Sequence, residues 1–225
     1  MTINTTIQDE WVNSQNMIYR KNNLVFAVVL KNASTWAALM LSHNGFTQGR
    51  AKEIDWHRDH VFGFIQDPWT RRIKGITEDL LTFYSVEQYL LNNLGKNFWL
   101  NHLVFGPHSI PLSLLWHDKM YQIDWIPIDH PRINLDLALE KLFLHHGMEY
   151  QTLEKSDKHR HKSDTYQSEI FKTIQHITGH GNGNLHLMLS KDIDFYNTVI
   201  QNFDFDNNDS WNKISWLENI SSKQY

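Results

Sequence analysis

The stretch LVFAVVLKNASTWAAL, residues 24–39, carries the strongest indication of the fold. Its first seven residues, 24–30, are continuously apolar and valine-rich, which is typical of a short strand covered on both faces in a parallel sheet. Lys31 and four small or polar residues follow, and apolar residues then recur at helical spacing. We therefore expect a strand, a tight loop and a helix, with Ser34 or Thr35 as the helix N-cap.

The order of a strand followed by a helix occurs twice more. HVFGFIQ, residues 60–66, predicts a second buried strand, and Asp67-Pro68 supplies an N-cap followed by a proline at the first helical position. QIDWIPID, residues 122–129, predicts a third strand, and the helix after it, residues 135–147, ends at a glycine. This repetition predicts an α/β fold with a mainly parallel central sheet and helices on both faces.

The rest of the chain predicts connecting segments and further helices within one domain, residues 1–225. The polar residues 1–20 predict an N-terminal arm, and the polar residues 151–165 predict a long loop. A helix is expected over residues 166–178, and a last helix follows a glycine- and asparagine-rich break. Residues 204–225 are expected to form a C-terminal tail.

Composition excludes several classes of protein. The formal net charge of −4 argues against a general nucleic-acid binder, because a phosphate backbone demands a net basic surface. Cysteine is absent, which excludes disulfides and thiolate metal sites. No apolar run approaches the ~20 residues of a membrane helix, and the first residues lack the pattern of a signal peptide. We therefore expect a cytoplasmic protein with neither a nucleic-acid nor a membrane partner.

Two loops carry the residues that could hold an anion. In an open α/β sheet, ligands bind beyond the carboxyl ends of the strands. The loop after residues 24–30 would present the backbone N–H groups of residues 32–36 and the positive end of a helix dipole, to which Lys31 adds a full charge. Arg71 and Lys74 lie three residues apart on the next helix and so share one side of it. Alternatively, Lys31 is only solvated and the other two cations form an exposed helix face.

The same residues resemble the nucleotide-binding motifs of sulfotransferases. LKNASTW, residues 30–36, is similar to their 5′-phosphosulfate loop, which typically reads Pro-Lys, a small stretch, then Ser-Thr and often Trp. FIQDPWTRRIKGI, residues 64–76, is similar to their 3′-phosphate signature, a hydrophobic strand followed by Arg-Asp-Pro-x-x-Arg-x-x-Ser. Shorter segments resemble carbohydrate sulfotransferases in the same order: HSIPLS (108–113), DKHRHKS (157–163) and DIDFYN (192–197). The Walker pattern G-x-x-x-x-G-K-[ST] is absent, which argues against a nucleoside triphosphatase.

This resemblance implies a three-layer, P-loop-like fold and a reaction. The enzyme would move a sulfonate group from 3′-phosphoadenosine-5′-phosphosulfate (PAPS) to a hydroxyl, on a carbohydrate or small-molecule acceptor, by in-line displacement without a metal. Lys31 would neutralise the charge that develops on the leaving group. The residues that the resemblance assigns to PAPS binding are Lys31, Asn32, Ala33, Ser34, Thr35, Trp36, Gln66, Arg71 and Lys74.

The chain departs from the family pattern at three of the quoted positions. Gln66 stands where the family usually has arginine, Lys74 where it usually has serine, and Leu112 where it has glutamine. One cation is lost and another gained, so Arg71 and Lys74 together could still neutralise a 3′-phosphate. If this exchange is not compensatory, the chain is a non-catalytic relative that binds a nucleotide or a glycan.

The general base is expected from the segment between the two phosphate loops, as in these enzymes. DWHRDH, residues 55–60, lies there, and His57 is the preferred candidate. His60, Glu53 and His108 are the alternatives, His108 because it matches the His-x-x-Pro segment.

The fourteen histidines also raise the alternative of a histidine-rich, metal-binding interaction protein. The pairs with ligand-like spacing lie on three separate predicted elements, and no His-Glu-x-x-His pattern is present. We therefore predict no metal site. These pairs are His145-His146, His159-x-His161 and His176-x-x-x-His180.

Overall fold

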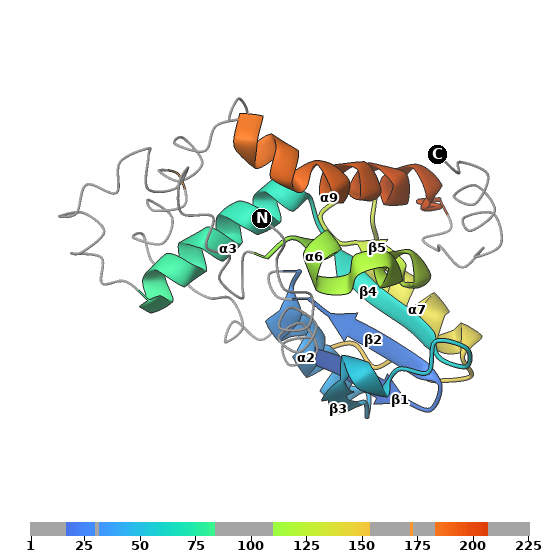
Figure 1. The fold of residues 1–225 in the computed structure, drawn as a ribbon. Helices are drawn as coiled ribbons and strands as arrows, with labels where there is room; N and C mark the ends of the chain where they lie inside the picture. The colour runs from blue at the N-terminus through green and yellow to red at the C-terminus, as the bar shows by residue number, and fades with distance from the viewer. Residues whose placement is uncertain (1–16, 30–31, 84–109, 154–171, 173–182, 207–225) are drawn as a thin grey trace.

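The protein has an α/β fold built on a mixed sheet (Figure 1). The computed structural model describes residues 17–29, 32–83, 110–153, 172 and 183–206. Within these ranges the sheet has five strands in the order β3-β1-β2-β4-β5. The strands are β1 (Met17–Lys21), β2 (Leu24–Val28), β3 (Thr47–Arg50), β4 (His60–Ile65) and β5 (Asp124–Pro127).

The three strands predicted from the sequence form the parallel half of the sheet. β2 pairs with β4 from Leu24↔His60 onward, and β4 pairs with β5 from Phe62↔Asp124 onward, both in parallel. The other half is antiparallel, because β1 lies between β2 and β3 and runs opposite to both. The α/β class is therefore confirmed, but the expectation of a mainly parallel sheet is wrong.

The antiparallel half comes from two strands that the sequence analysis missed. Residues 17–20, assigned to an N-terminal arm, belong to β1, which a tight turn at Asn22-Asn23 joins to β2. Asn22 has a φ of 54°, a left-handed conformation that asparagine tolerates better than most residues. Such a hairpin needs only a tight turn, whereas parallel neighbours need a crossover. The rest of the expected arm, residues 1–16, lies outside the described residues.

Most of the predicted helices are present with the expected ends. The described α-helices are α2 (Ser34–His43), α3 (Pro68–Phe83), α6 (Leu112–Trp116), α7 (Leu135–His145) and α9 (Gly183–Asn202), and the 3-10 helices are η1 (Ala51–Glu53) and η2 (His117–Gln122). Shortly after the ends of α2 and α7, Gly45 and Gly147 adopt positive φ angles of 77° and 65°. The helix expected over residues 166–178 lies outside the described residues apart from Lys172, as do residues 154–165 of the expected loop and 207–225 of the tail.

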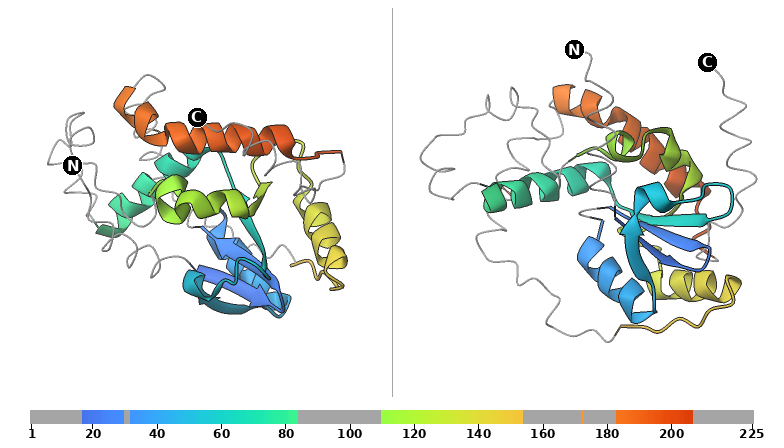
Figure 2. Two further views of the ribbon diagram at one scale, coloured as in Figure 1. Left: turned by 45° about the vertical axis from the view of Figure 1, so that its right-hand side comes forward. Right: turned by 60° about the horizontal axis from the view of Figure 1, so that its bottom comes forward.

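Helices cover both faces of the sheet, which gives three layers. On one face, Phe26, Phe62 and Phe64 pack with residues of α2 and α7. On the other face, Trp125 packs with residues of α6, η2 and α9. The right-hand view of Figure 2 shows the sheet between these two helical layers. The expected arrangement of helices on both faces is therefore confirmed for the described residues.

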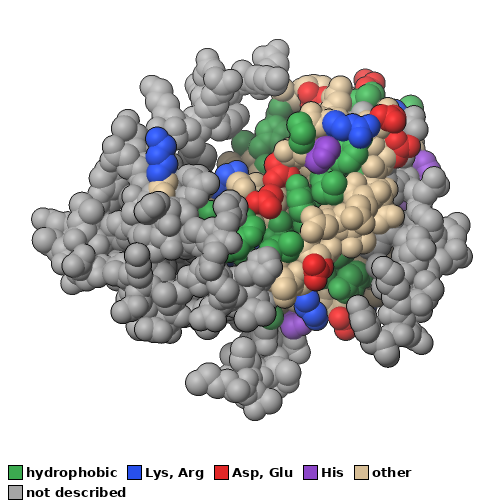
Figure 3. Space-filling model, turned by 90° about the horizontal axis from the view of Figure 1, so that it is seen from above, with side chains coloured by type: hydrophobic (Ala, Val, Ile, Leu, Met, Phe, Trp, Pro, Cys, Tyr) green, Lys and Arg blue, Asp and Glu red, His purple; other side chains and the backbone are tan. Residues whose placement is uncertain are grey.

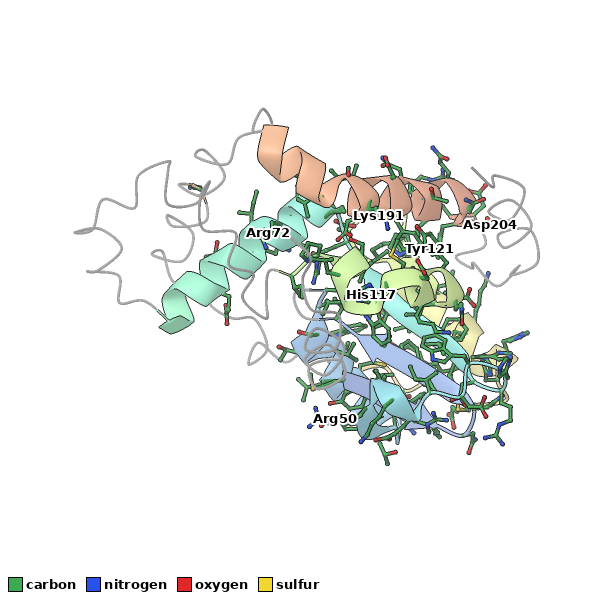
Figure 4. The ribbon with its side chains drawn as sticks, in the orientation of Figure 1. Arg50, Arg72, His117, Tyr121, Lys191 and Asp204 are labelled. Atoms are coloured by element: carbon green, nitrogen blue, oxygen red, sulfur yellow. The ribbon has the colours of Figure 1, made fainter. Side chains whose placement is uncertain are left out.

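Helix α3 leaves the carboxyl end of β4 and packs against α9. Figure 4 labels Arg72 on α3 and Lys191 on α9, near the point where the two helices approach each other. Asp192 of α9 is buried, and its carboxylate accepts hydrogen bonds from the backbone N–H groups of Leu112 and Ser113 at the start of α6. One aspartate therefore joins α9 to the first turn of α6. Among the described residues, no helix has both the length and the hydropathy to span a membrane.

Candidate functional site

The candidate site lies at the carboxyl edge, which we define as the edge of the sheet where β2, β4 and β5 end. These three strands are parallel, so the loops that follow them meet at one edge. Helix α2 begins there at Ser34 and α3 begins there at Pro68. The two motifs that resemble sulfotransferases therefore belong to adjacent strands and open toward the same edge.

Asn32 fastens the loop after β2 to the neighbouring strand. Its side-chain Nδ2 donates a hydrogen bond of 2.7 Å to the carbonyl of Phe64 in β4, and its backbone N–H donates one of 3.1 Å to Val29. The residue is only 1% exposed. Its Oδ1 atom is also buried, and it has no hydrogen-bond partner among the described residues. Lys31, the preceding residue, lies outside the described residues.

The N-terminus of α2 has no side-chain cap in the described part of the chain. Its N-cap residue is Ala33, in the left-handed conformation with φ 54° and ψ 32°, so the prediction of Ser34 or Thr35 as N-cap is wrong. The helix begins one residue too early for either hydroxyl to act as N-cap. The N–H of Ala37 donates the first helical hydrogen bond, to the carbonyl of Ala33. The N–H groups of Ser34, Thr35 and Trp36 therefore find no carbonyl in a preceding turn and can bind an anion.

The expected set of backbone donors is thus smaller than residues 32–36. The N–H of Asn32 is used by the Val29 carbonyl, which removes it from the set. Trp36 is partly buried and its ring packs against Phe64, with ring centroids 5.8 Å apart, so its indole belongs to the core. Thr35 is exposed and Ser34 is partly exposed, which leaves their hydroxyls near the surface at the helix start.

The N-terminus of α3 is capped, as the sequence predicts. Oδ1 of Asp67 accepts a hydrogen bond of 2.8 Å from the N–H of Thr70, and α3 begins at Pro68. The N–H of Asp67 donates to Oδ2 of Asp129, 2.7 Å away, just beyond β5. Of the two helix starts at the carboxyl edge, α3 has a side-chain cap and α2 has none among the described residues, so the start of α2 is the better candidate for binding an anion.

Asp129 is a residue of this edge that the sequence analysis missed. Besides the bond from Asp67, it accepts a hydrogen bond of 2.9 Å on Oδ1 from the hydroxyl of Tyr196 in α9. Partial burial, and then the hydrogen bond to Asp129, raise the pKa of Tyr196, so the phenol stays protonated and donates. Asp129 closes the predicted strand 122–129, and an aspartate at the carboxyl end of a strand is the signal that could have pointed to it.

Gln66 and Lys74 lie side by side. The Nζ atom of Lys74 donates a hydrogen bond to Oε1 of Gln66 over 3.3 Å. Gln66 is buried at the end of β4, whereas Lys74 is exposed on the second turn of α3. These are the two positions that differ from the family's 3′-phosphate signature.

Arg71 is buried, unlike Lys74. Its side chain is 4% exposed, and this burial lowers the pKa of the guanidinium to about 10, while the charge of Asp192 acts in the opposite direction. The guanidinium is therefore still charged at neutral pH. An exposed helix face, which was the alternative for both cations, does not describe Arg71. Its charge instead lies beneath the carboxyl edge and close to Asp192.

The preferred base, His57, does not lie at this edge. His60 pairs with Leu24 at the start of β2, so the turn that ends at His60, and His57 with it, lies at the amino edge of the sheet. β4 has six residues, which at about 3.3 Å per residue separate its two ends by about 17 Å. Glu53 instead follows β3, and its carboxylate lies beside Gly49, two strands away from β2. The structure therefore does not bring His57 or His60 to the loop after β2, and Glu53 lies to one side of it. His108 lies outside the described residues.

The segment around His57 has a structural role. Both carboxylate oxygens of Asp59 accept hydrogen bonds from the guanidinium of Arg20, at 2.7 and 2.8 Å. Burial by itself would raise the pKa of Asp59, but the bonds from Arg20 and from the N–H of Asp55 hold it below its usual value. These contacts tie the loop before β4 to β1.

The described histidines do not assemble a metal site. Within the described ranges, no group of three or more His, Cys, Asp or Glu side chains could hold a metal ion. His146 lies near His60 and His145, with ring centroids 5.0 and 5.3 Å away, at the end of α7. The other two predicted pairs, His159-x-His161 and His176-x-x-x-His180, lie outside the described residues.

No protein-family model, curated protein or solved structure matches this chain. The functional argument therefore rests on the motifs of the sequence and on the geometry of the carboxyl edge. Figure 3 views the molecule from above α9, and over the described part of the chain its basic and acidic side chains are interspersed among hydrophobic ones. The candidate anion-binding features are the start of α2 and the pair of Gln66 and Lys74.

Proposed function

We propose that the carboxyl edge binds PAPS and that the protein is a PAPS-dependent sulfotransferase acting on a hydroxyl of a carbohydrate. The observation that carries the proposal is the contact between Gln66 and Lys74. The family places a cation at the first of these positions and a hydroxyl at the second, whereas here the first position holds an amide and the second holds the cation. The positive charge beside the end of β4 is therefore kept, although a different residue provides it.

The donors at the carboxyl edge suit a nucleotide with two separate phosphate groups. The N–H groups of Ser34, Thr35 and Trp36 would hold the 5′-phosphate at the positive end of α2. Lys74, oriented by Gln66, would bind the 3′-phosphate, and the buried charge of Arg71 would favour it from below. The proposal includes a P-loop-like unit made of β2, its loop and α2, beside which the antiparallel pair β1–β3 is an addition.

PAPS supplies the sulfonate group. In the transfer, a bond forms from the acceptor oxygen to sulfur, and the bond from sulfur to the 5′-phosphate oxygen breaks, so that adenosine 3′,5′-bisphosphate leaves. In the proposal, Lys31 stabilises the negative charge that develops on the leaving oxygen. The acceptor proton needs a base. His57 and His60 lie at the opposite edge of the sheet, and Glu53 lies beside β3, two strands away from β2, so among the four predicted candidates the proposal assigns this role to His108.

A second candidate function is a non-catalytic protein that binds the nucleotide without transferring sulfonate. The observation in its favour is that three of the four predicted bases lie away from the loop after β2: His57 and His60 at the amino edge, and Glu53 beside β3. Binding without turnover needs the phosphate donors alone, and these do not depend on a base.

Two measurements test the proposal. Isothermal titration with adenosine 3′,5′-bisphosphate should show binding to the wild-type chain that is lost or strongly weakened in Lys74→Ala and in Lys31→Ala. Transfer of labelled sulfonate from PAPS to a panel of glycans and small alcohols then separates the two candidates. Binding with no transfer to any acceptor would favour the non-catalytic protein, and the absence of binding would refute both.

A further inference from the structure

We propose that the side chain of Asn32 is a positioning residue that couples the two phosphate subsites of the carboxyl edge. The inference rests on the proposed function, because it concerns how one nucleotide would engage both subsites at once. It assigns to the amide of Asn32 a role distinct from that of the backbone N–H groups that follow it in the loop.

The first step is that Asn32 holds the start of α2 against β4. Its amide donates a buried hydrogen bond of 2.7 Å to the carbonyl of Phe64. This bond joins the loop after β2 to the backbone of β4, between residues that are 32 positions apart in the sequence. The sheet already pairs β2 with β4 as far as Ala27↔Gly63, so the amide of Asn32 fastens the two strands beyond their last paired residues.

The second step is the short path from Asn32 to the other subsite. Phe64 is followed by Ile65 and then by Gln66, whose side chain contacts Lys74. On the other side, Asn32 is followed directly by Ala33, the N-cap of α2, and by the N–H groups that would hold the 5′-phosphate. One hydrogen bond therefore fixes the spacing between the helix start and the side-chain cation.

The third step is that this amide has an unused acceptor. Oδ1 of Asn32 has no hydrogen-bond partner in the described ranges, although the residue is only 1% exposed. A buried carbonyl oxygen without a donor is costly, and the bond to Phe64 uses only the donor side of this amide. A leucine of similar size would remove the unused acceptor, but it would leave the carbonyl of Phe64 without its donor.

The consequence is a prediction about ligands that carry one phosphate or two. A ligand with both phosphates gains from the second contact only if the two subsites are held at the right spacing. Loosening that spacing lowers the gain, whereas binding of a single phosphate is much less affected. Coupling between sites is typically worth factors of about 5 to 150.

The test compares adenosine 3′,5′-bisphosphate with adenosine 5′-monophosphate by isothermal titration. In the wild-type chain the bisphosphate should bind the more tightly. In Asn32→Leu, and also in Asn32→Ser, the ratio of the two affinities should fall by about tenfold, while the affinity for the monophosphate changes much less. Circular dichroism confirms that each variant is folded before it is titrated.

The matched control is Asn44→Leu at the other end of α2. Asn44 is also a buried asparagine, and its amide bonds to the backbone of Met40 and of Gln151. Its substitution should lower stability but leave the ratio of the two affinities unchanged. A purely structural effect would instead lower the ratio in Asn44→Leu as well, and that result would overturn the inference.

The remaining outcomes separate this inference from the proposed function. If the wild-type chain does not bind the bisphosphate, the proposed function fails and this inference fails with it. If the wild type prefers the bisphosphate and both Asn32 variants keep the full preference, the proposed function stands and the role of Asn32 is refuted. In the wild-type chain, the side-chain amide NMR signals of Asn32 should shift on addition of either nucleotide, and signals that respond to neither would also refute it.

Discussion

The Nζ atom of Lys74 lies 3.3 Å from Oε1 of Gln66, so an exposed cation on α3 is held by a buried amide at the end of β4. A lysine at this place has a flexible stem, and the contact with Gln66 restricts where its charge lies. Gln66 and Lys74 are also the two positions that depart from the sulfotransferase motif that this segment resembles. Under the proposed function, their contact would place a positive charge beside the end of β4.

Substitutions of Lys74 and Gln66 test whether the charge at this position binds the nucleotide. Lys74→Ala should weaken binding of adenosine 3′,5′-bisphosphate by about tenfold, because a charge-assisted hydrogen bond is worth about 1.5–3 kcal/mol in general and this one is partly exposed. The double variant Gln66→Arg with Lys74→Ser should recover most of the affinity, since it restores the family pattern. Isothermal titration measures both. Unchanged affinity in Lys74→Ala would remove this lysine from the site.

Substitution of Arg71 should lower the stability of the fold even when no ligand is present. Because its guanidinium is buried and close to Asp192, Arg71→Met should lower the free energy of unfolding by about 3 kcal/mol in urea titrations without ligand. The control is Arg58→Met, since the side chain of Arg58 is 81% exposed and its pair with Asp55 lies on the surface. That variant should unfold almost like the wild type. A folded, fully stable Arg71→Met that has lost only its affinity for the nucleotide would contradict a structural role.

His57 should be dispensable. It is exposed in the loop before β4, at the amino edge of the sheet. His57→Ala should therefore leave nucleotide affinity and any sulfonate transfer within about twofold of the wild type, the usual range for a surface substitution. A loss of transfer with intact binding would show that the acceptor reaches the amino edge, and would restore His57 as the base.

The sequence predicted the parallel half of the sheet because each of its strands is rich in apolar residues and is followed by an α-helix. It did not predict β1 and β3, because MIYRK and TQGR are short, contain polar residues and are not followed by an α-helix. Pairing with β2 buries Ile18 and Tyr19 of β1, and that burial depends on tertiary contacts that no local pattern contains. The edge strand and the hairpin strand are therefore the parts of this fold that hydrophobic periodicity could not predict.

The sequence predicted only those parts of the candidate site whose positions follow from the order and direction of the strands. Both phosphate motifs follow apolar strands, and parallel pairing brings them to one edge. His57 lies between the motifs in sequence, but it precedes its strand instead of following it, and this places it at the other edge. The contact of Gln66 with Lys74 depends on how α3 leaves the end of β4, and the burial of Arg71 near Asp192 depends on the packing of α3 against α9. The sequence reveals neither arrangement.

The hydrogen bond from Tyr196 to Asp129 should appear in the pH dependence of stability. Because the folded protein raises the pKa of Tyr196 above the ordinary value of 10.0, the unfolded chain loses this proton first, and stability should fall as the pH rises above about 10. Tyr196→Phe should be less stable than the wild type at pH 8, by about 1 kcal/mol or less. Above pH 10 the wild type should lose stability more steeply, so that the difference shrinks. A constant difference from pH 8 to 11, measured by urea unfolding, would contradict the raised pKa.

Gly63 should tolerate no side chain, although it lies in the middle of β4. An added Cβ would lie 2.6 Å from Cζ3 and 2.9 Å from Cε3 of Trp125 on the neighbouring strand. Trp125 is 1% exposed and its Nε1 donates a hydrogen bond of 2.8 Å to Met120, so the ring cannot move aside without breaking that bond. Gly63→Ala should therefore lower the free energy of unfolding by about 2 kcal/mol, as overpacking of a core commonly does. In the control, Gly49→Ala in β3, the close atom is the end of the flexible Glu53 side chain, which can turn away, so stability should change little. Equal losses in the two variants would mean that backbone entropy, and not the fixed ring of Trp125, decides the cost.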